Sequence, residues 1–313
     1  MPRRVPRAIA SQPPPLPLPP LDMRLLAELP SLSLQARCMV EGFLSGHHRS
    51  PQKGSSVEFA EYRAYQPGDD LRRVDWRLYG RTDRLHVKQY EEETQLRVFV
   101  VLDTSGSMDF QSREKVMRKI EFARIVIAAL ALLARRQGDA FGLGIAGAEL
   151  RGFLSARSSV SHWRSFIGKL EVVSPAGKAS LATALLDLAE VVPPRSMIVI
   201  ASDFYEETPR LENALRRLRY DHHDLIGAHV LDPVELDFDL DHSGTFVDAE
   251  SPGWRLKLDA PSVRRGYLER FGEFCSELDE LFHEAGGEMV RLRTDRAPFE
   301  ALSLYLAQRE QRL

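Results

Sequence analysis

The chain has 313 residues, with 42 Lys and Arg against 45 Asp and Glu, and its formal net charge is −3. A charge so close to neutral argues against a basic protein that binds nucleic acid over its whole surface, and it gives no electrostatic reason to bind a membrane. The two cysteines, Cys38 and Cys275, are too few for a disulfide framework. The longest apolar run, 125–134, is far short of the roughly 20 residues that a membrane span needs. We therefore expect a cytoplasmic globular protein without membrane insertion and without nucleic acid as a partner.

The first 20 residues are distinguished by their proline content, because they hold eight of the 19 prolines in the chain. So many prolines interrupt the apolar region of a secretory signal, and they also prevent an amphipathic helix. We predict that residues 1–20 form a disordered, polyproline-II-like tail outside the folded domains.

Residues 21–95 predict an N-terminal helix followed by a small β-rich subdomain. The spacing of apolar residues over 22–45 indicates a helix that is interrupted at Pro30. Residues 57–66 and 85–90 have the composition of two strands, and a Pro-Gly turn lies between them.

From residue 96 to residue 311, predicted strands and helices alternate. The first strand, LRVFVVLD, is a continuous apolar run, which is typical of a strand buried on both faces of a parallel sheet. Further strands are predicted at 141–145, 196–203, 224–232 and 288–292, with a hairpin at 244–258. Helices are predicted at 113–137, 161–170, 181–191, 208–220, 262–284 and 298–311. This alternation predicts an α/β domain with a doubly wound, mostly parallel sheet.

Polar side chains follow two of the predicted core strands. The first strand runs into Asp103, which is followed by Ser105 and Ser107, and the strand at 196–203 ends in Asp203. In doubly wound sheets, ligands bind beyond the carboxyl ends of the strands. Carboxylate and hydroxyl oxygens are hard donors that suit Mg²⁺ or Mn²⁺ better than zinc. The sequence therefore predicts a site for a divalent cation at this edge of the sheet. The structural alternative is a polar loop that caps the next helix, with Ser107 or Asp109 as the N-cap residue.

This D-x-S-x-S pattern after a buried strand resembles the von Willebrand factor A fold and its metal-ion-dependent adhesion site. The resemblance implies that Ser105 and Ser107 coordinate Mg²⁺ directly, and that Asp103 and Asp203 act largely through water. A partner carboxylate would then fill an open coordination position.

One ligand of that adhesion site is missing from this sequence. The expected Gly-Gly-Thr-Asp-Leu pattern falls on residues 177–181, so that Ala179 stands where the threonine should be. Ser180 or Thr183 could substitute for it, and Lys178 could place a competing positive charge nearby. The resemblance therefore leaves open a metal-free scaffold of the same fold.

The segment upstream of the first core strand carries a second motif, Y-x-P-G-D-D-x-R-x-[IV]-D-W. It resembles the hallmark of the bacterial family known as domain of unknown function fifty-eight (DUF 58), and the resemblance covers roughly residues 22–310. The family implies a MoxR-class AAA-type ATPase as a partner, and other von Willebrand factor A-type proteins as further partners. The residues of this motif region are Arg63, Tyr65, Pro67, Gly68, Asp69, Asp70, Arg72, Asp75 and Trp76.

The arginines and aspartates of this motif region alternate within a short span. Their density favours an ion-pair network that fastens the β-rich subdomain to the sheet, with Trp76 as its apolar anchor. The alternative is a basic patch that binds phosphate or nucleic acid, but the interleaved acids argue against it.

Enzymatic alternatives fit the spacing poorly. Haloacid-dehalogenase phosphatases need a second aspartate two residues after the first, and Ser105 occupies that position. A metal-dependent hydrolase built on Asp103 and Asp203 is the one enzymatic hypothesis that remains. We expect instead a non-enzymatic adaptor that binds acidic loops of a partner through a divalent cation.

Overall fold

The computed structural model describes residues 21–47, 61–65, 74, 76–89, 95–175, 177, 179–250 and 253–311. The predicted proline-rich tail, most of the motif between residues 66 and 75, and Lys178 lie outside these residues. None of the helices in the described part of the chain combines the length and the apolar composition that a membrane-spanning segment needs.

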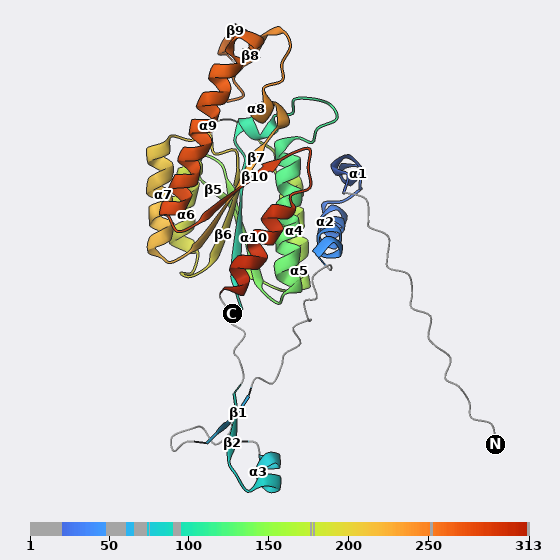
Figure 1. The fold of residues 1–313 in the computed structure, drawn as a ribbon, viewed down its shortest axis with the longest axis vertical. Helices are drawn as coiled ribbons and strands as arrows, with labels where there is room; N and C mark the ends of the chain where they lie inside the picture. The colour runs from blue at the N-terminus through green and yellow to red at the C-terminus, as the bar shows by residue number, and fades with distance from the viewer. Residues whose placement is uncertain are drawn as a thin grey trace, which may run out of the picture.

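A six-stranded sheet forms the centre of the α/β domain (Figure 1). Its strand order is β10-β7-β6-β3-β4-β5. Every neighbouring pair is parallel except β4 and β5, which are antiparallel. The predicted α/β class with a mostly parallel sheet is therefore confirmed. The strands are β3 (Arg97–Asp103), β4 (Ala140–Ala146), β5 (Leu150–Arg157), β6 (Met197–Ser202), β7 (Asp224–Leu231) and β10 (Glu288–Arg293).

The sequence pattern gives no strand at β5, and the reason is its place at the edge of the sheet. All residues of β4 and β6 are buried, whereas every residue of β5 is exposed or half-buried. An edge strand needs no continuous apolar run, so the signal that identifies the central strands is absent from it.

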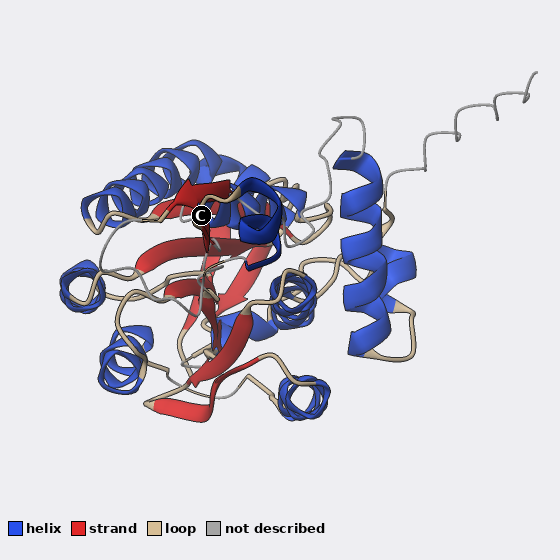
Figure 2. Ribbon diagram, turned by 90° about the horizontal axis from the view of Figure 1, so that it is seen from below, coloured by secondary structure: helices blue, strands red, loops and turns tan. Residues whose placement is uncertain are grey.

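Helices cover both faces of the sheet, as Figure 2 shows. On one face, alternate residues of β3 such as Val98 and Val100 share a core with α2, α4, α5 and α10. On the other face, Phe99 and Val101 share a core with α6, α7 and α9. The helices are α1 (Met23–Ala27), α2 (Leu32–His47), α4 (Lys119–Arg136), α5 (Val160–Val172), α6 (Leu181–Val191), α7 (Thr208–Tyr220), α9 (Ala260–Glu284) and α10 (Phe299–Glu310).

The N-terminal helical segment is broken at Pro30, as predicted, into α1 and α2. The side chain of Asp22 caps α1 by accepting a hydrogen bond from the backbone N–H of Arg24 at 2.9 Å. Met39 and Phe43 of α2 are fully buried in the core that α2 shares with α4. This helical pair is therefore part of the packing of the α/β domain.

Strands β1 (Glu61–Ala64) and β2 (His86–Gln89) pair antiparallel in a two-stranded sheet of their own. Between them lies α3 (Trp76–Thr82), which the sequence pattern does not predict. Trp76 is 59% exposed and meets the ring of Tyr79 edge-on at 6.2 Å. The prediction that Trp76 is a buried apolar anchor is therefore wrong, because the side chain lies on the surface of α3.

The helix predicted at 113–137 begins only at Lys119. Residues 110–118 form a loop instead, and the carboxylate of Asp232 accepts a hydrogen bond from the backbone N–H of Ser112 at 3.0 Å. The N-cap residue of α4 is Arg118, so the alternative in which Ser107 or Asp109 caps this helix is wrong.

After β7 the chain forms a short helix, α8, and then a β-hairpin of β8 and β9. Helix α8 (Pro233–Asp237) begins with a capping box between Asp232 and Glu235. Strands β8 (Ser243–Val247) and β9 (Arg255–Asp259) form the predicted hairpin, which leads into α9.

Candidate functional site

The carboxyl ends of β3 and β6 lie side by side at the centre of the sheet. The register pairs Leu102 with Ala201, so Asp103 ends its strand level with Ser202, and Asp203 follows directly. Asp103 is 3% exposed and Asp203 is 1% exposed. The structure therefore brings the two strand-terminal carboxylates together in a buried setting.

Asp103 is held by two hydrogen bonds. Its Oδ1 accepts from the backbone N–H of Ser105 at 2.8 Å, and its Oδ2 accepts from the hydroxyl of Ser202 at 2.5 Å. Burial raises the pKa of Asp103 to about 6, and the negative charge of Asp203 acts in the same direction. A buried carboxylate of this kind is stabilised in its ionised form by a nearby cation.

The two serines of the DxSxS loop (residues 103–107) face each other. The Oγ atoms of Ser105 and Ser107 are 3.0 Å apart. In octahedral Mg²⁺ sites with metal–oxygen distances of about 2.1 Å, neighbouring ligands are separated by about 3.0 Å. The serine hydroxyls therefore fit two adjacent positions around such an ion.

A buried lysine, which the sequence reasoning missed, places a positive charge beside the carboxylate of Asp203. Lys119 is fully buried, and its Nζ donates to Asp203 at 2.7 Å and to Glu235 at 2.8 Å. Burial alone would lower the pKa of Lys119, but the two carboxylates outweigh burial and hold the pKa above its usual value. The Nζ atom also lies 5.3 Å from the ring centre of Tyr205. A lysine at the start of the apolar α4 is the one sequence signal that could have identified this group.

Ser180, the predicted substitute for the missing threonine, has a structural role. It is the N-cap residue of α6 and accepts from the backbone N–H of Thr183 at 3.3 Å. Its hydroxyl also lies 2.9 Å from that of Thr183 and 3.2 Å from Glu206 Oε2. The hydroxyls of Ser180 and Thr183 are therefore engaged with each other and with the start of α6. Glu206, which accepts a hydrogen bond from Ser180, is an acidic residue of this region that the sequence reasoning missed.

A small cavity of about 10 Å³ lies between these loops. A volume of this size has room for about one water-sized particle. Within the described residues, no group of three or more His, Cys, Asp or Glu side chains is arranged to hold a metal ion. A cation here would depend on serine hydroxyls and water as well as on carboxylates. The lining residues are Asp103, Ser105, Ala179, Leu181, Ser202, Phe204, Tyr205, Glu206 and Glu250.

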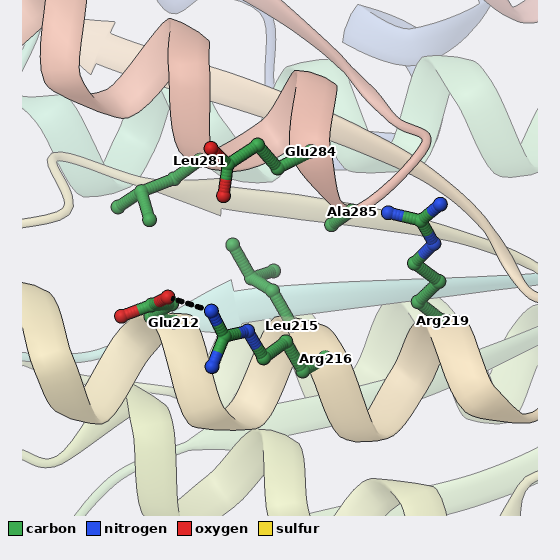
Figure 3. Close-up of a pocket in the computed structure, with 7 residues that line it drawn as sticks. All are labelled: Glu212, Leu215, Arg216, Arg219, Leu281, Glu284 and Ala285. Carbon is green, nitrogen blue, oxygen red and sulfur yellow. Dashed lines mark ion pairs between the residues drawn. The ribbon is translucent and has the colours of Figure 1, made fainter.

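Larger hollows lie elsewhere on the molecule. A groove of about 280 Å³ lies between α7 and α9, and an ion pair between Glu212 and Arg216 runs along its α7 side (Figure 3). Glu284 and Arg219 also line this groove, so its charges are mixed. A second hollow of about 270 Å³ lies between the α1–α2 connection and α4. Neither contains a residue that the sequence predicted as functional.

Comparison with known proteins adds a family match and several relatives. The family model described as "Protein of unknown function DUF58" matches residues 61–273. The Uncharacterized protein Rv1480 of Mycobacterium tuberculosis is 30% identical over 280 residues, which are 88% of this chain and 86% of the relative. The Uncharacterized protein Mb1516 of Mycobacterium bovis matches with the same identity and coverage.

Among solved structures, similar chains include the conserved hypothetical protein BatB from Bacteroides thetaiotaomicron. It is 16% identical with a TM-score of 0.46, and the match covers 69% of this chain and 99% of BatB. The VWA domain of SpRpn10 is 12% identical with a TM-score of 0.37, and the match covers 69% of this chain and 95% of that domain. The α/β fold class follows from the strand order and the placement of helices on both faces of the sheet.

Proposed function

The chain belongs to the DUF58 family, and we propose that it is a non-enzymatic protein-interaction adaptor that binds an acidic partner loop through a divalent cation. One observation supports the proposal above all others. The serine hydroxyls of Ser105 and Ser107, at 3.0 Å, lie in the loop that begins with the buried Asp103, and Asp203 follows the adjacent strand end. Such a set of hard oxygen donors at the carboxyl edge of a parallel sheet suits Mg²⁺ or Mn²⁺.

In this proposal, Ser105 and Ser107 hold the cation directly. Hydrogen bonds from the protein fix the positions of the Asp103 and Asp203 carboxylates. The two carboxylates can therefore orient the water ligands of the cation. The bound cation keeps one coordination position open, and a carboxylate of another molecule can occupy it. Ala179 contributes no oxygen, so we expect a weaker site than one with a threonine at this position.

The proposed partner is a MoxR-class AAA ATPase that presents an Asp or Glu on a loop, and other von Willebrand factor A-type proteins are further candidates. These partners follow from the resemblance of the D-x-S-x-S and Y-x-P-G-D-D motifs to those families. The test is capture of the purified ATPase by the full chain in Mg²⁺ and in EDTA. We expect capture in Mg²⁺ only.

The cation itself is tested by calorimetry with MgCl₂ and MnCl₂. We expect the wild-type chain to bind these cations with a dissociation constant in the millimolar range or lower. The double variant Ser105→Ala/Ser107→Ala should bind them about tenfold more weakly, or worse. Absence of binding to the wild-type chain at millimolar metal would contradict the metal part of the proposal.

A second candidate function is a metal-free scaffold of the same fold, and the contact of Lys119 with Asp203 favours it. The buried ammonium already neutralises one of the two carboxylates, at 2.7 Å. This alternative predicts that Asp103→Ala leaves capture of the ATPase intact and that EDTA has no effect. Both candidates predict no metal-dependent turnover of phosphoesters by the pure protein, which distinguishes them from a hydrolase.

A further inference from the structure

The tip of the β8–β9 hairpin (residues 248–250, the hairpin tip) lies directly on the DxSxS loop. A Cβ atom at Gly106 would lie 2.8 Å from the carbonyl oxygen of Ala249. Real Cβ atoms essentially never approach a backbone oxygen so closely, so glycine permits this contact. The backbone N–H of Gly106 also donates to the carbonyl of Gly177 at 3.1 Å. Three loops that are far apart in sequence therefore meet at Gly106.

The hairpin tip is positioned by its own hydrogen bonds. The backbone N–H of Asp248 donates to the carbonyl of Trp254 at 3.3 Å and continues the pairing of β8 with β9. The carboxylate of Asp248 accepts from the backbone N–H of Glu250 at 2.8 Å. These bonds fix the chain direction that brings Glu250 to the loop.

Glu250 lines the same small cavity as Asp103 and Ser105. The cavity has room for about one water-sized particle, so a carboxylate from a second molecule would compete with Glu250 for the same small space. The open coordination position of the proposed function is therefore covered in this conformation by a segment that itself carries a carboxylate.

We propose that Glu250 is a cation ligand supplied by the chain itself, and that the hairpin tip must leave the site before a partner carboxylate can bind. This inference rests on the proposed function, because it assigns the regulation of that same site. The local charges support it. Asp103 and Glu250 line the cavity together with the hydroxyl of Ser105, so Glu250 brings a second carboxylate to the edge of the serine pair. Cation binding and docking of the hairpin tip are then coupled, so each strengthens the other.

The first test is calorimetry with Mn²⁺ on the full chain and two variants. Glu250→Gln keeps the size of the side chain and removes its charge. Glu207→Gln is the matched control, because Glu207 is 71% exposed, pairs with Arg210 on the surface and does not line the cavity. We expect Glu250→Gln to weaken Mn²⁺ binding about tenfold and the control to change it less than about twofold.

The second test follows the hairpin tip with trypsin, which cleaves after the exposed Arg255 and Lys257. We expect Mg²⁺ to slow cleavage at these two residues in the wild-type chain and in Glu207→Gln, but not in Glu250→Gln. Protection that persists in Glu250→Gln overturns the inference. If the wild-type chain binds metal and Glu250→Gln binds it equally well, only this inference fails. If the wild-type chain binds no metal, the metal part of the proposed function fails as well.

Discussion

The Nζ atom of Lys119 lies 2.7 Å from Oδ2 of Asp203, and both side chains are buried. The same ammonium group is 2.8 Å from Glu235 Oε1, so one positive charge serves two carboxylates. This contact connects the start of α4 with the strand end that carries half of the candidate site. It gives the site a fixed internal cation, and any metal ion has to bind in its presence.

Replacing this lysine should be strongly destabilising. Lys119→Met removes the ammonium and leaves Asp203 and Glu235 buried without it, which costs about 3–5 kcal/mol of unfolding free energy for buried pairs of this kind. Urea unfolding followed by circular dichroism measures the change.

The matched control for Lys119→Met is Arg265→Met. Arg265 is 92% exposed and lies 3.8 Å from Glu269, so its loss should cost less than about 1 kcal/mol. A cost below about 1 kcal/mol for Lys119→Met would show that the two carboxylates are neutralised in another way.

A glycine in the DxSxS loop gives a test of the contact with the hairpin tip. Gly106→Ala places a Cβ atom 2.8 Å from the Ala249 carbonyl, so either the tip or the loop must move. We expect a loss of about 1–3 kcal/mol in stability and faster trypsin cleavage after Arg255.

Gly272→Ala is the control for this substitution. Gly272 lies inside α9, where a Cβ atom meets nothing within 4 Å. Alanine should therefore stabilise the helix by about 0.5–1 kcal/mol and leave cleavage after Arg255 unchanged. Equal cleavage of wild-type and Gly106→Ala protein would mean that the tip does not depend on this close approach.

A buried histidine predicts how stability depends on pH. His229 lies on β7, in contact with the rings of Phe204 and Phe274, and both of its ring nitrogens are buried. Burial lowers its pKa from 6.5 to about 3; the charge of Asp203 opposes this shift, whereas Arg291 and Lys119 add to it. Between these values the unfolded chain binds more protons than the folded chain. His229 therefore costs no stability above pH 6.5, and below it lowers the free energy of unfolding by about 1.4 kcal/mol per pH unit, down to about pH 3. The raised pKa of Asp103 acts in the opposite direction below about pH 6, so the prediction concerns the difference between the wild-type chain and a His229 variant.

His229→Leu should remove this part of the pH dependence. Unfolding free energies measured in EDTA at several values between pH 4 and pH 6.5 give the slope for each protein. The control is His242→Leu, because His242 is exposed. If the wild-type chain and His229→Leu have the same slope, His229 is not the group that titrates on unfolding.

The sequence predicts the central part of the fold well because burial on both faces leaves a clear pattern. Strands β3 and β6 contain continuous apolar runs and β7 is apolar apart from Asp224 and His229, and each is found within a residue or two of its predicted place. The first turns expected for α4 were wrong for a tertiary reason. Asp232, 120 residues further along the chain, binds the backbone of Ser112, and no local pattern records that contact.

In the candidate site too, some residues could be predicted from the sequence and others could not. Asp103 and Asp203 are predictable because the first ends a buried strand, the second directly follows one, and neighbouring parallel strands end at one edge. Lys119, Glu206 and Glu250 reach the site from a helix and two loops, and their positions depend on tertiary packing. A charged residue on a loop has no periodic signal, so sequence reasoning finds the carboxylates of the strands and misses those of the loops.

The residue at the missing ligand position gives a gain-of-function test. Ala179 lines the cavity beside Asp103 and Ser105, and the adhesion-site pattern places a threonine there. Ala179→Thr adds a hydroxyl oxygen at this position. If a cation is held by Ser105 and Ser107, one more oxygen ligand should raise Mg²⁺ affinity about tenfold, measured by calorimetry.

Ala179→Val separates the effect of the hydroxyl from the effect of size, because valine has nearly the shape of threonine without the oxygen. We expect Ala179→Val to bind Mg²⁺ no better than the wild-type chain, and less tightly where the added bulk narrows a cavity of about 10 Å³. Equal affinities for the threonine and valine variants would mean that residue 179 does not face the cation. Tighter binding by the threonine variant alone would place residue 179 in the coordination sphere with the two serines.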